Sequence, residues 1–423
     1  MKKLKIAFAG LGSRGNAYAE ALKHFEDRIE FTAAADIIPE KLAMFSEKHG
    51  IAPEMQFDSA EEMLQADRVA DIMIIATMDR QHYGHAMPAL EKGYHLLLEK
   101  PISPELNECI EIADLANKKG LNVVVCHVLR YTPFYRKMKE IIDSGAIGEV
   151  MAIDAIENVL YWHQAHSFVR GNWRNTAETS PMILQKSCHD MDIYLWLAGQ
   201  HSKAVSSFGS LKYYKPELAP KGATQRCDEN CPHFKTCPYN VYDAYIAKAE
   251  NGNFNWPVDV VAPDKTMESL VKNLKEGPYG RCVYHCDNDV VDHQVVNILL
   301  ENGGTIAFTM CAFTSHGSRR AHIMGTKGDM ICDMSKKEII LTRFGSETEI
   351  FDTSKNASDA FGHGGGDFGI VKDLIDIFDP DVPASPSLTS IDVSIESHIV
   401  ALAAEKSRVN GGMLVDIKEF TNI

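Results

Sequence analysis

Three glycines near the start of the chain have the spacing of a dinucleotide-binding turn. Gly10, Gly12 and Gly15 form a G-x-G-x-x-G motif between a short apolar run and a helix-forming stretch. The first glycine permits a tight turn, the second lets the backbone approach a diphosphate, and the third lets the helix pack closely on the strand. N–H groups at the start of that helix would bind the diphosphate. We therefore predict cofactor contacts from these glycines and from Ser13 and Arg14 between them.

A carboxylate follows at the place where such a site binds the adenosine ribose. The expected second strand, IEFTAAAD, ends in Asp36. A carboxylate there would bond both ribose hydroxyls and repel a 2′-phosphate. The next residues are Ile37, Ile38 and Pro39, with no arginine for a 2′-phosphate. The sequence predicts NAD rather than NADP as cofactor; the alternative is a structural glycine turn with a helix-capping aspartate.

A group of cysteines suggests a second kind of chemistry. Cys227, Cys231 and Cys237 stand close together in RCDENCPHFKTCPY, and Cys282 and Cys286 follow in YGRCVYHCDND. Both stretches belong to a polar segment, about residues 215–287, that we expect to bury little core of its own. We predict one structural metal ion, zinc first, held by the first three cysteines and Cys282. An iron–sulfur cluster, free buried thiols and disulfide or redox chemistry are alternatives.

The bulk composition limits the partners and the compartment. The chain has 423 residues and a formal net charge of −15, which disfavours nucleic acid as a partner because phosphates attract basic surfaces. No apolar run approaches the roughly 18 residues that span a bilayer, so no membrane partner is expected. Ten cysteines without signs of export predict a cytoplasmic protein with reduced thiols.

Strand and helix patterns divide the chain into two domains. Over residues 1–125, apolar runs such as ADIMIIATM and YHLLLEKP alternate with helical patterns, which predicts a Rossmann fold with a doubly wound parallel sheet. Ligands bind at the carboxyl ends of such strands, and this places five further residues at the cofactor: Thr77, Met78, His82, Glu99 and Lys100. Over residues 126–423, strand patterns without intervening helices predict an α+β domain with an open, mostly antiparallel sheet.

Several segments together resemble a known enzyme family. AFAGLGSRG, IIATMDRQHYGHA, LLLEKPIS and VLRYTPFYRKMKEIIDSGAIGEV are similar to the glucose–fructose oxidoreductase, inositol dehydrogenase and MocA (Gfo/Idh/MocA) family. Its members are NAD(P)-dependent enzymes that act mainly on sugars and cyclitols. The resemblance implies that Lys100 contacts both the nicotinamide region and the substrate hydroxyl. It also implies that the outer face of the open sheet often meets a partner subunit, so we expect a homo-oligomer.

The stretch SPMILQKSCHDMDIYLWLAG resembles the substrate helix of this family. Family dehydrogenases place Asp-x-x-x-His there, whereas this chain has Gln185 at the aspartate position, followed by Lys186, and His189 at the histidine position. Glutamine can bond a substrate hydroxyl but cannot accept its proton. The predicted catalytic groups are therefore Lys100, His189 and Lys186, the alternative for His189 being a buried helix histidine. Asp192 is expected to be structural and to bond backbone or an arginine.

Two loops are expected to reach the substrate. YWHQAHSFVRGNWRN offers His166, Arg170 and Trp173, because an aromatic plane suits a pyranose face and arginine donors suit hydroxyls. FGHGGGDFG offers His363, and Asp367 is expected to begin a helix as its N-cap. The alternative for each loop is an ordered surface loop with no role in substrate binding.

Together these features predict an NAD-dependent oxidoreductase that moves hydride from a secondary hydroxyl of a sugar, glycoside or cyclitol to NAD. One alternative is an NAD-dependent glycoside hydrolase that works by oxidation and elimination without net redox. A second is a non-catalytic NAD-binding regulator. NADH accumulation, aglycone release or neither would separate the three.

Overall fold

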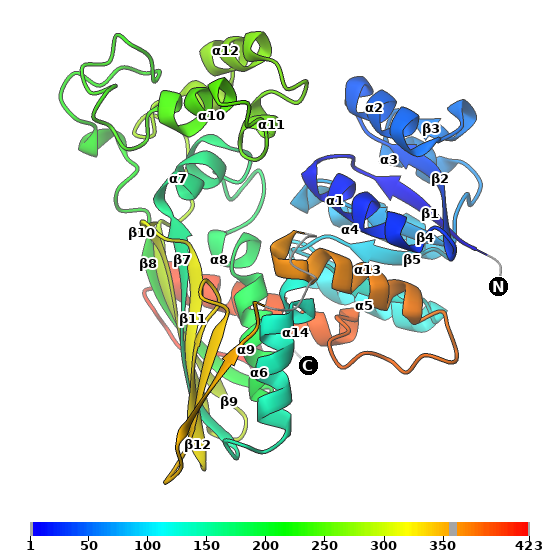
Figure 1. Ribbon diagram of the computed structural model, residues 1–423, viewed down its shortest axis with the longest axis vertical. Coiled ribbons are helices and arrows are strands. Elements are labelled where there is room, and N and C mark those ends of the chain that lie inside the picture. The colour runs from blue at the N-terminus through cyan, green and yellow to red at the C-terminus, as the bar shows by residue number, and fades with distance from the viewer. Residues whose placement is uncertain (1–2, 355–361, 422–423) are drawn as a thin grey trace.

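Two sheets organise the computed structural model, which describes residues 3–354 and 362–421 (Figure 1). The first sheet has six strands in the order β3-β2-β1-β4-β5-β6, all parallel. Its strands are β1 (Leu4–Ala9), β2 (Ile29–Ala35), β3 (Gln56–Phe57), β4 (Ile72–Ile75), β5 (His95–Leu98) and β6 (Val123–Val125). The helices between them are α1 (Ser13–Leu22), α2 (Pro39–His49), α3 (Ala60–Gln65), α4 (His82–Glu91) and α5 (Leu106–Lys119). This strand order confirms the predicted Rossmann fold.

The second sheet is open, with nine strands in the order β14-β13-β12-β11-β7-β10-β9-β8-β15. Among the described strands of this second sheet, only β7 and β10 pair in parallel, so the predicted mostly antiparallel sheet is confirmed. The strands are β7 (Val150–Leu160), β8 (Ser202–Ser210), β9 (His293–Leu300), β10 (Thr305–Thr314), β11 (Ser318–Gly325), β12 (Gly328–Asp333), β13 (Glu338–Arg343), β14 (Thr348–Asp352) and β15 (Val415–Asp416).

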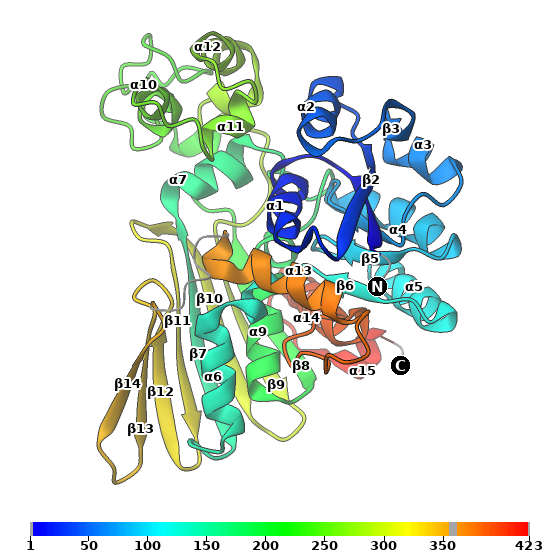
Figure 2. The same ribbon diagram turned by 45° about the vertical axis from the view of Figure 1, so that its right-hand side comes forward.

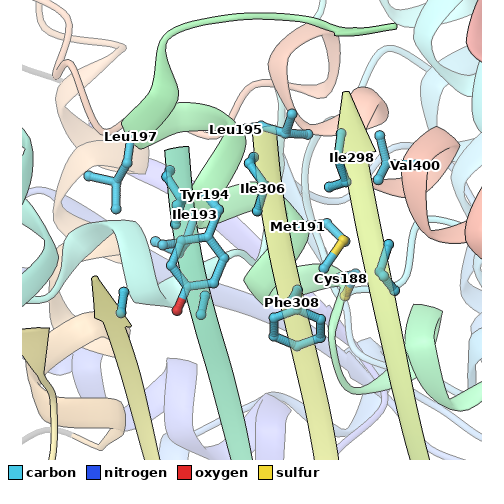
Figure 3. Packing of buried hydrophobic residues seen from close by; sticks show 14 of the residues in the cluster. Cys188, Met191, Ile193, Tyr194, Leu195, Leu197, Ile298, Ile306, Phe308 and Val400 are labelled. Atoms are coloured by element: carbon cyan, nitrogen blue, oxygen red, sulfur yellow. The ribbon is translucent and has the colours of Figure 1, made fainter. Parts of the chain in front are cut away.

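Helices cover only one face of the nine-stranded sheet. The helices of this part are α6 (Pro133–Asp143), α7 (Tyr161–Gln164), α8 (Met182–Gln185), α9 (Cys188–Ala198), α10 (Ala247–Glu250), α11 (Val258–Val261), α12 (Met267–Glu276), α13 (Gly366–Asp376), α14 (Ile391–Val409) and α15 (Ile417–Thr421). Residues of α9 such as Met191 and Tyr194 pack with Ile298, Ile306 and Phe308 of the sheet (Figure 3). Residues along β9 alternate between buried and exposed, as expected for a sheet with one covered face.

Helix α13 lies beside the nucleotide-binding domain although it comes late in the chain (Figures 1 and 2). Its apolar residues Ile370, Val371 and Leu374 share one buried cluster with Ile6 and Phe8 of β1. The predicted domain boundary at residue 125 assigned α13 to the second domain, whereas its apolar residues pack with the first. This packing brings the glycine-rich segment before α13 to the same edge of the parallel sheet as the dinucleotide turn.

The cysteine-rich insertion forms a lobe of α10, α11 and α12 above α7 (Figures 1 and 2). The expectation that it buries little core of its own is wrong. Eight buried residues pack together there: Val241, Tyr245, Ala249, Val258, Val261, Ala262, Leu270 and Leu274. α10 and α11 are single turns, too short to show an apolar period, whereas α12 has a clear apolar face that buries Leu270 and Leu274. Within the described part of the chain, no helix is long and apolar enough to cross a bilayer.

Candidate active site

The dinucleotide turn joins β1 to α1 and has the shape that a diphosphate requires. Gly10 has a φ of +91°, and a Cβ there would lie 2.6 Å from the carbonyl oxygen of Ala76. A Cβ at Gly15 would lie 2.2 Å from the carbonyl oxygen of Gly10. A Cβ at Gly12, in contrast, would meet no atom within 4 Å, and α1 has no side-chain N-cap. The chain therefore leaves space and N–H groups at this helix N-terminus, which fits the predicted diphosphate.

Asp36 lies directly after β2 and is held in place by two backbone groups. The Leu11 N–H donates to Oδ2 at 2.7 Å, and the Ile38 N–H donates to Oδ1 at 2.9 Å. Each carboxylate oxygen accepts one of these bonds and keeps a second lone pair for a ribose hydroxyl. Ile37 and Ile38 beside it are exposed and carry no charge that would attract a 2′-phosphate.

We expect Asp36→Ala to narrow the preference for NAD over NADP, because the 2′-phosphate would no longer meet a carboxylate. A change of roughly tenfold or more in the ratio of the two dissociation constants is expected, as for loss of a charged hydrogen-bond partner. Isothermal titration with both cofactors measures it, and Asp27→Ala, in a turn before β2, is the control. Equal affinity of the unmodified chain for NAD and NADP would contradict the assignment.

The turns after β4 and β5 are tied to each other by His82. Its Nδ1 lies 2.7 Å from the carbonyl oxygen of Pro101, and its Nε2 lies 3.1 Å from the carbonyl oxygen of Thr77. The Thr77 hydroxyl contacts His85 at 3.0 Å, and the Met78 N–H donates to a nearby glutamine. His82 is buried, so its contribution to a cofactor site is to hold these two turns together.

Glu99, at the end of β5, is the centre of a network across three segments. Its Oε1 accepts from Arg14 Nε at 2.8 Å and from the Tyr18 hydroxyl at 2.6 Å, and its Oε2 accepts from the Lys100 N–H at 2.9 Å. Arg14 also donates to both carboxylate oxygens of Asp367, at 2.7 and 3.1 Å. Burial alone would raise the pKa of Glu99, but the charges of Arg14 and Lys100 outweigh it and hold that pKa low.

The segment before α13 differs from its predicted role. Asp367 is not the N-cap of α13; Gly365 occupies that position, and the Asp367 carboxylate instead binds Arg14. His363 also contacts Asp367, with Nδ1 at 3.1 Å, and its own φ is +43°, a strained value for histidine. Burial would raise the pKa of Asp367, but Arg14 and His363 hold it well below its ordinary value. The strain and the pairing hold the ring of His363, which is partly exposed, at the edge of the site.

Lys100 meets the substrate helix at its backbone. Its Nζ donates to the main-chain carbonyl of Gln185 at 2.6 Å. The expected single helix is divided here into α8 and α9, with Lys186 and Ser187 between them. Gln185 and His189 therefore stand on two helices rather than on one continuous face. The carbonyl at the end of α8 is free to accept from Lys100 because the helix stops there.

His189, at the start of α9, lies in the low-polarity region behind Lys100. Burial lowers its pKa well below the ordinary value, and the charge of Lys100 lowers it further, so the ring is neutral at pH 7. Its Nδ1 is buried and has no hydrogen-bond partner among the described residues. Asp192, further along α9, pairs with Arg130 at 2.6 and 2.7 Å, which confirms its expected structural role.

A cavity of about 310 Å³ opens beside β7 and β11, and neither Lys100 nor His189 is among its lining residues. Its walls include Glu157, Lys186, Arg319 and His163. Lys186 Nζ lies 3.2 Å from Glu157, and Arg319 bridges Glu157 at 2.9 Å and Asp190 at 2.8 Å. Burial lowers the pKa of Lys186 despite its carboxylate partner. Burial also lowers the pKa of His163, with contributions from the charges of Lys186 and Arg319.

Glu157, Arg319 and Asp190 were missed in the sequence reasoning. Each stands in a strand or helix whose pattern gives no local signal for a site. Glu157 interrupts the alternation of VMAIDAIE only weakly, and Arg319 follows a turn where arginine is common on the surface. The pairing of β7 with β11, which places Arg319 opposite Glu157, is what brings them together.

The loop residues predicted to bind substrate have different surroundings. Trp173 donates from Nε1 to Asp79, at the end of β4, across 3.2 Å and so joins the two domains. Arg170 is only 2% exposed and donates to the main-chain carbonyls of Tyr239 and Arg281, both at 2.7 Å. His166 is buried against the insertion, bonds the Tyr245 hydroxyl, and burial lowers its pKa to about 3. The structure therefore places Arg170 and His166 outside the site.

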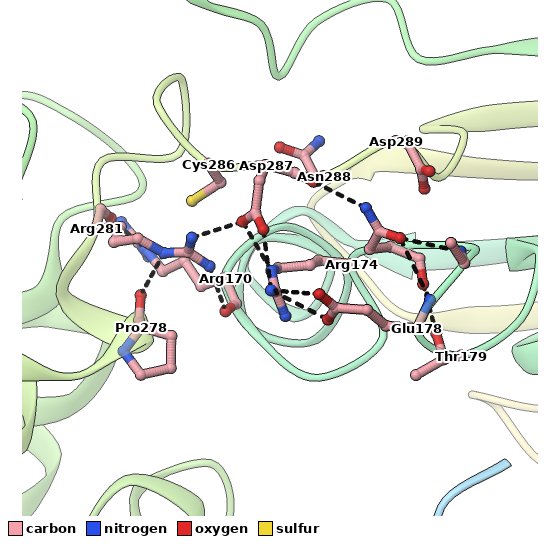
Figure 4. A network of polar contacts seen from close by, with 12 residues as sticks. Arg170, Arg174, Glu178, Thr179, Pro278, Arg281, Cys286, Asp287, Asn288 and Asp289 are labelled. Carbon is pink, nitrogen blue, oxygen red and sulfur yellow. Dashed lines mark hydrogen bonds and ion pairs between the residues drawn. The ribbon is translucent and has the colours of Figure 1, made fainter. Parts of the chain in front are cut away.

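Arg170 belongs to a polar junction that fixes the insertion to the loop before α8 (Figure 4). Arg174 donates to both oxygens of Asp287, at 2.8 and 2.9 Å, and Arg281 donates to the same carboxylate at 2.6 Å. The Thr176 N–H donates to Asp289 at 2.7 Å. These bonds hold the loop that carries Trp173 against the end of the insertion.

The thiols of the insertion do not form the predicted zinc site. Across residues 3–354 and 362–421, no three or more His, Cys, Asp or Glu side chains are grouped so that they could hold a metal ion. Cys227 packs against the apolar cluster of the insertion, while Cys237, Cys282 and Cys286 pack against a second cluster around Tyr214. The prediction of a metal site at Cys227, Cys231, Cys237 and Cys282 is therefore not supported. The insertion has an apolar core that contributes to its stability instead.

Two models of one oxidoreductase family match this chain. The GFO_IDH_MocA model, described as an oxidoreductase family with an NAD-binding Rossmann fold, matches residues 4–127. The model of the C-terminal alpha/beta domain of that family matches residues 139–358. YteT of Bacillus subtilis, a protein named as an oxidoreductase, is 24% identical over 427 aligned residues, which cover 96% of this chain and 97% of YteT.

Two further proteins are similar over different lengths. Inositol 2-dehydrogenase of Corynebacterium glutamicum (strain R) is 28% identical over 207 residues, so the match spans about half of each chain, 48% and 56%. An oxidoreductase of Agrobacterium radiobacter, solved with NAD⁺, L-tartaric acid and magnesium, superposes with a TM-score of 0.69 at 16% identity over 99% of both chains. At that identity the likeness concerns the fold.

Proposed function

Because the chain belongs to the Gfo/Idh/MocA oxidoreductase family, with its NAD-binding Rossmann domain followed by its C-terminal domain, we propose that it oxidises a secondary hydroxyl of a sugar, glycoside or cyclitol. The observation that carries this proposal is the contact of Lys100, after β5, with the Gln185 carbonyl, because it places the ammonium between the nucleotide-binding domain and the α8–α9 segment that carries Lys186 and His189. The Glu99–Arg14 network ties the same place to the dinucleotide turn.

In this proposal the chain binds, orients and moves protons. NAD, when bound, supplies the hydride acceptor. Gly10, Gly12, Gly15 and the start of α1 hold the diphosphate, and Asp36 holds the ribose. The Lys100 ammonium donates to the substrate oxygen and stabilises the negative charge that develops there. In this proposal the neutral ring of His189 accepts the hydroxyl proton through Nε2, because Nδ1 is fully buried.

The cavity residues would then fix the substrate ring. Lys186 and Arg319 offer donors, and Glu157 offers acceptors, so neighbouring hydroxyls find both kinds of partner. Their opposite charges compensate within the wall. A neutral polyol therefore suits this cavity better than a strongly charged substrate does, because burying one further charge would leave it unpaired.

The function is tested by incubating the protein with NAD and a panel of free sugars, aryl glycosides and cyclitols, followed at 340 nm and by aglycone release. Net NADH formation is the expected result. Aglycone release without net NADH would replace it by oxidation–elimination hydrolysis. Neither signal, with NAD bound, would favour a non-catalytic NAD-binding regulator.

One observation favours the hydrolase as second candidate. Elimination needs a second proton-transfer group besides the one that serves the oxidised hydroxyl. His363, paired with Asp367 on the opposite side of the site from α9, is such a group. The charge of His363 contributes to lowering the pKa of His189, which supports placing the two rings near one region.

We also propose that the chain forms a homo-oligomer through the uncovered face of the nine-stranded sheet, in a reducing, cytoplasmic setting. Large apolar side chains are exposed on strands of this sheet, among them Met151, Phe208, Val295, Leu299 and Ile331. A water-exposed apolar face of this kind marks an interaction surface. All ten cysteines are free thiols.

The oligomer is expected to dissociate when this face becomes charged. The double change Val295→Glu and Leu299→Glu on β9 should convert it to monomers in analytical ultracentrifugation. The control pair is Met44→Glu on α2 and Leu218→Glu in the insertion, exposed apolar side chains outside this sheet, and it should leave the oligomer intact. A wild-type monomer at micromolar concentration would contradict the proposal.

A further inference from the structure

Two tryptophans stand beside the cavity at the junction between the sheet and the insertion. Trp162 lies in α7, directly after β7, and Trp256 lies just before α11 in the insertion. Their ring centroids are 5.3 Å apart with an interplanar angle of 47°. Trp256 is 42% exposed, which leaves a large apolar ring surface in contact with water. We call these two residues the tryptophan pair.

The tryptophan pair is connected to the cavity by one residue. His163 lines the cavity, and its ring lies edge-on to Trp256 with centroids 4.9 Å apart. Lys248 Nζ lies 4.4 Å from the ring centroid of Trp162 and holds that side of the pair in place. In both views α11 is the part of the insertion that faces the nucleotide-binding domain (Figures 1 and 2). The pair therefore lies at the boundary of the site rather than on a remote surface.

The size of the cavity limits what can enter it. A volume of about 310 Å³ stands at the lower end of the range of about 300–1,000 Å³ for small-molecule sites. A sugar ring bound among Glu157, Lys186 and Arg319 leaves a linked second ring free to extend past His163, in the cavity wall, toward Trp256. The neighbouring apolar surface is the tryptophan pair, and the C–H face of a pyranose packs on such a surface while its hydroxyls stay in water.

We propose that the tryptophan pair is a second carbohydrate subsite, so that the substrate is a glycoside of two linked sugar rings rather than a free sugar or a cyclitol. The proposal rests on the proposed function, since it takes the cavity as the place of the reacting ring. The insertion then has a role in specificity, because it supplies Trp256. The reacting ring occupies the cavity, and the second ring packs on Trp256.

The test compares one-ring and two-ring substrates in the full-length protein with NAD. The one-ring substrates are glucose, galactose and myo-inositol, and the two-ring substrates are cellobiose, maltose, lactose and melibiose. p-Nitrophenyl glucoside tests whether an aromatic ring can replace the second sugar ring at the subsite. At least one two-ring sugar should have a KM about tenfold below that of its one-ring counterpart. Trp256→Ala should abolish this difference by raising the KM of the two-ring sugar alone, with kcat unchanged, and Trp256→Phe should largely restore it.

Tyr242→Ala is the matched control, because Tyr242 lies in the same insertion and is also 42% exposed. It should leave both KM values unchanged. Equal KM values for one-ring and two-ring sugars, or an equal rise in both with Trp256→Ala, would overturn the subsite. Preference for the aryl glycoside over every disaccharide would also overturn it.

A failure of the proposed function would give a different result. If no sugar produces NADH, quenching of tryptophan fluorescence by the same disaccharides still reports the subsite. Quenching by a disaccharide that is lost in Trp256→Ala and kept in Tyr242→Ala would support the subsite without the reaction. Absence of quenching by the whole panel would overturn the subsite.

Discussion

Lys100→Met is expected to lower kcat/KM by about 10²-fold or more, the usual effect of removing a positioned acid–base or charge-stabilising group. Methionine keeps most of the apolar stem but removes the ammonium that donates to the Gln185 carbonyl. NAD affinity should change little, because Gly12 and Asp36 hold the other end of the cofactor. Steady-state kinetics with the best substrate of the panel and isothermal titration with NAD measure the two effects separately.

Two variants show whether the loss is specific to Lys100. Lys118→Met changes an exposed lysine of the same domain and should leave kcat/KM unchanged. Gln185→Ala should cost far less than Lys100→Met, because Lys100 contacts the main-chain carbonyl of Gln185 and any side chain retains it. Unchanged turnover in Lys100→Met would remove Lys100 from the proposed mechanism.

The free energy of unfolding is expected to fall by at least about 4 kcal/mol between pH 7.5 and 5.5. Three buried histidines, His127, His189 and His398, lie ring against ring with centroids 5.6 and 5.5 Å apart. Burial lowers the pKa of each, that of His398 to about 3, and nearby positive charges lower the first two further. In the unfolded chain the same rings titrate near pH 6.5.

The direction follows from proton uptake by the two states. Below about pH 6.5 the unfolded chain binds protons at these histidines and the folded chain does not, so acid favours unfolding. Each group contributes about 1.4 kcal/mol over this interval, and three contribute about 4. That is a large part of the stability of a typical domain, about 5–15 kcal/mol.

Urea titrations at pH 7.5, 6.5 and 5.5 measure the fall. His398→Gln should reduce the difference between pH 7.5 and 5.5 by about 1.4 kcal/mol, whatever it does to stability at pH 7.5. His316→Gln changes an exposed histidine and should leave the difference unchanged. If the free energy of unfolding falls by less than about 1.4 kcal/mol between pH 7.5 and 5.5, the contribution of one histidine, the folded chain takes up protons at this cluster and the prediction is wrong.

Local sequence was sufficient where one short segment holds the whole feature. The three glycines of the dinucleotide turn lie within six residues of one another, and Asp36 directly follows its strand. Both features could therefore be predicted from local sequence. The alternation of strands and helices also predicted the parallel sheet and its site at the strand ends. Lys100 and His189 were found through the family resemblance, since nothing in either segment alone points to the other.

Features built from distant segments could not be predicted in this way. Asp367 has the sequence of a helix cap, yet it binds Arg14, which is 353 positions away. The core of the insertion is assembled from several separate segments, so the sequence did not reveal it, and a metal site was predicted as the source of its stability. In both cases the local sequence pattern predicted a common feature, a helix cap or a metal site. The contacts that replace these features form only when distant segments meet in the folded chain.

The sequence by itself determined the two kinds of sheet and the shape of the dinucleotide turn, because each depends on neighbours within one element or one turn. The preference for NAD over NADP stays a prediction from Asp36. Only the tertiary structure decided which charges are paired: Glu157 with Lys186 and Arg319, and Glu99 with Arg14. Burial makes such pairs obligatory, since a buried charge without a partner is strongly destabilising. Which partner meets which charge depends on how strands and helices pack, and that is a property of the whole fold.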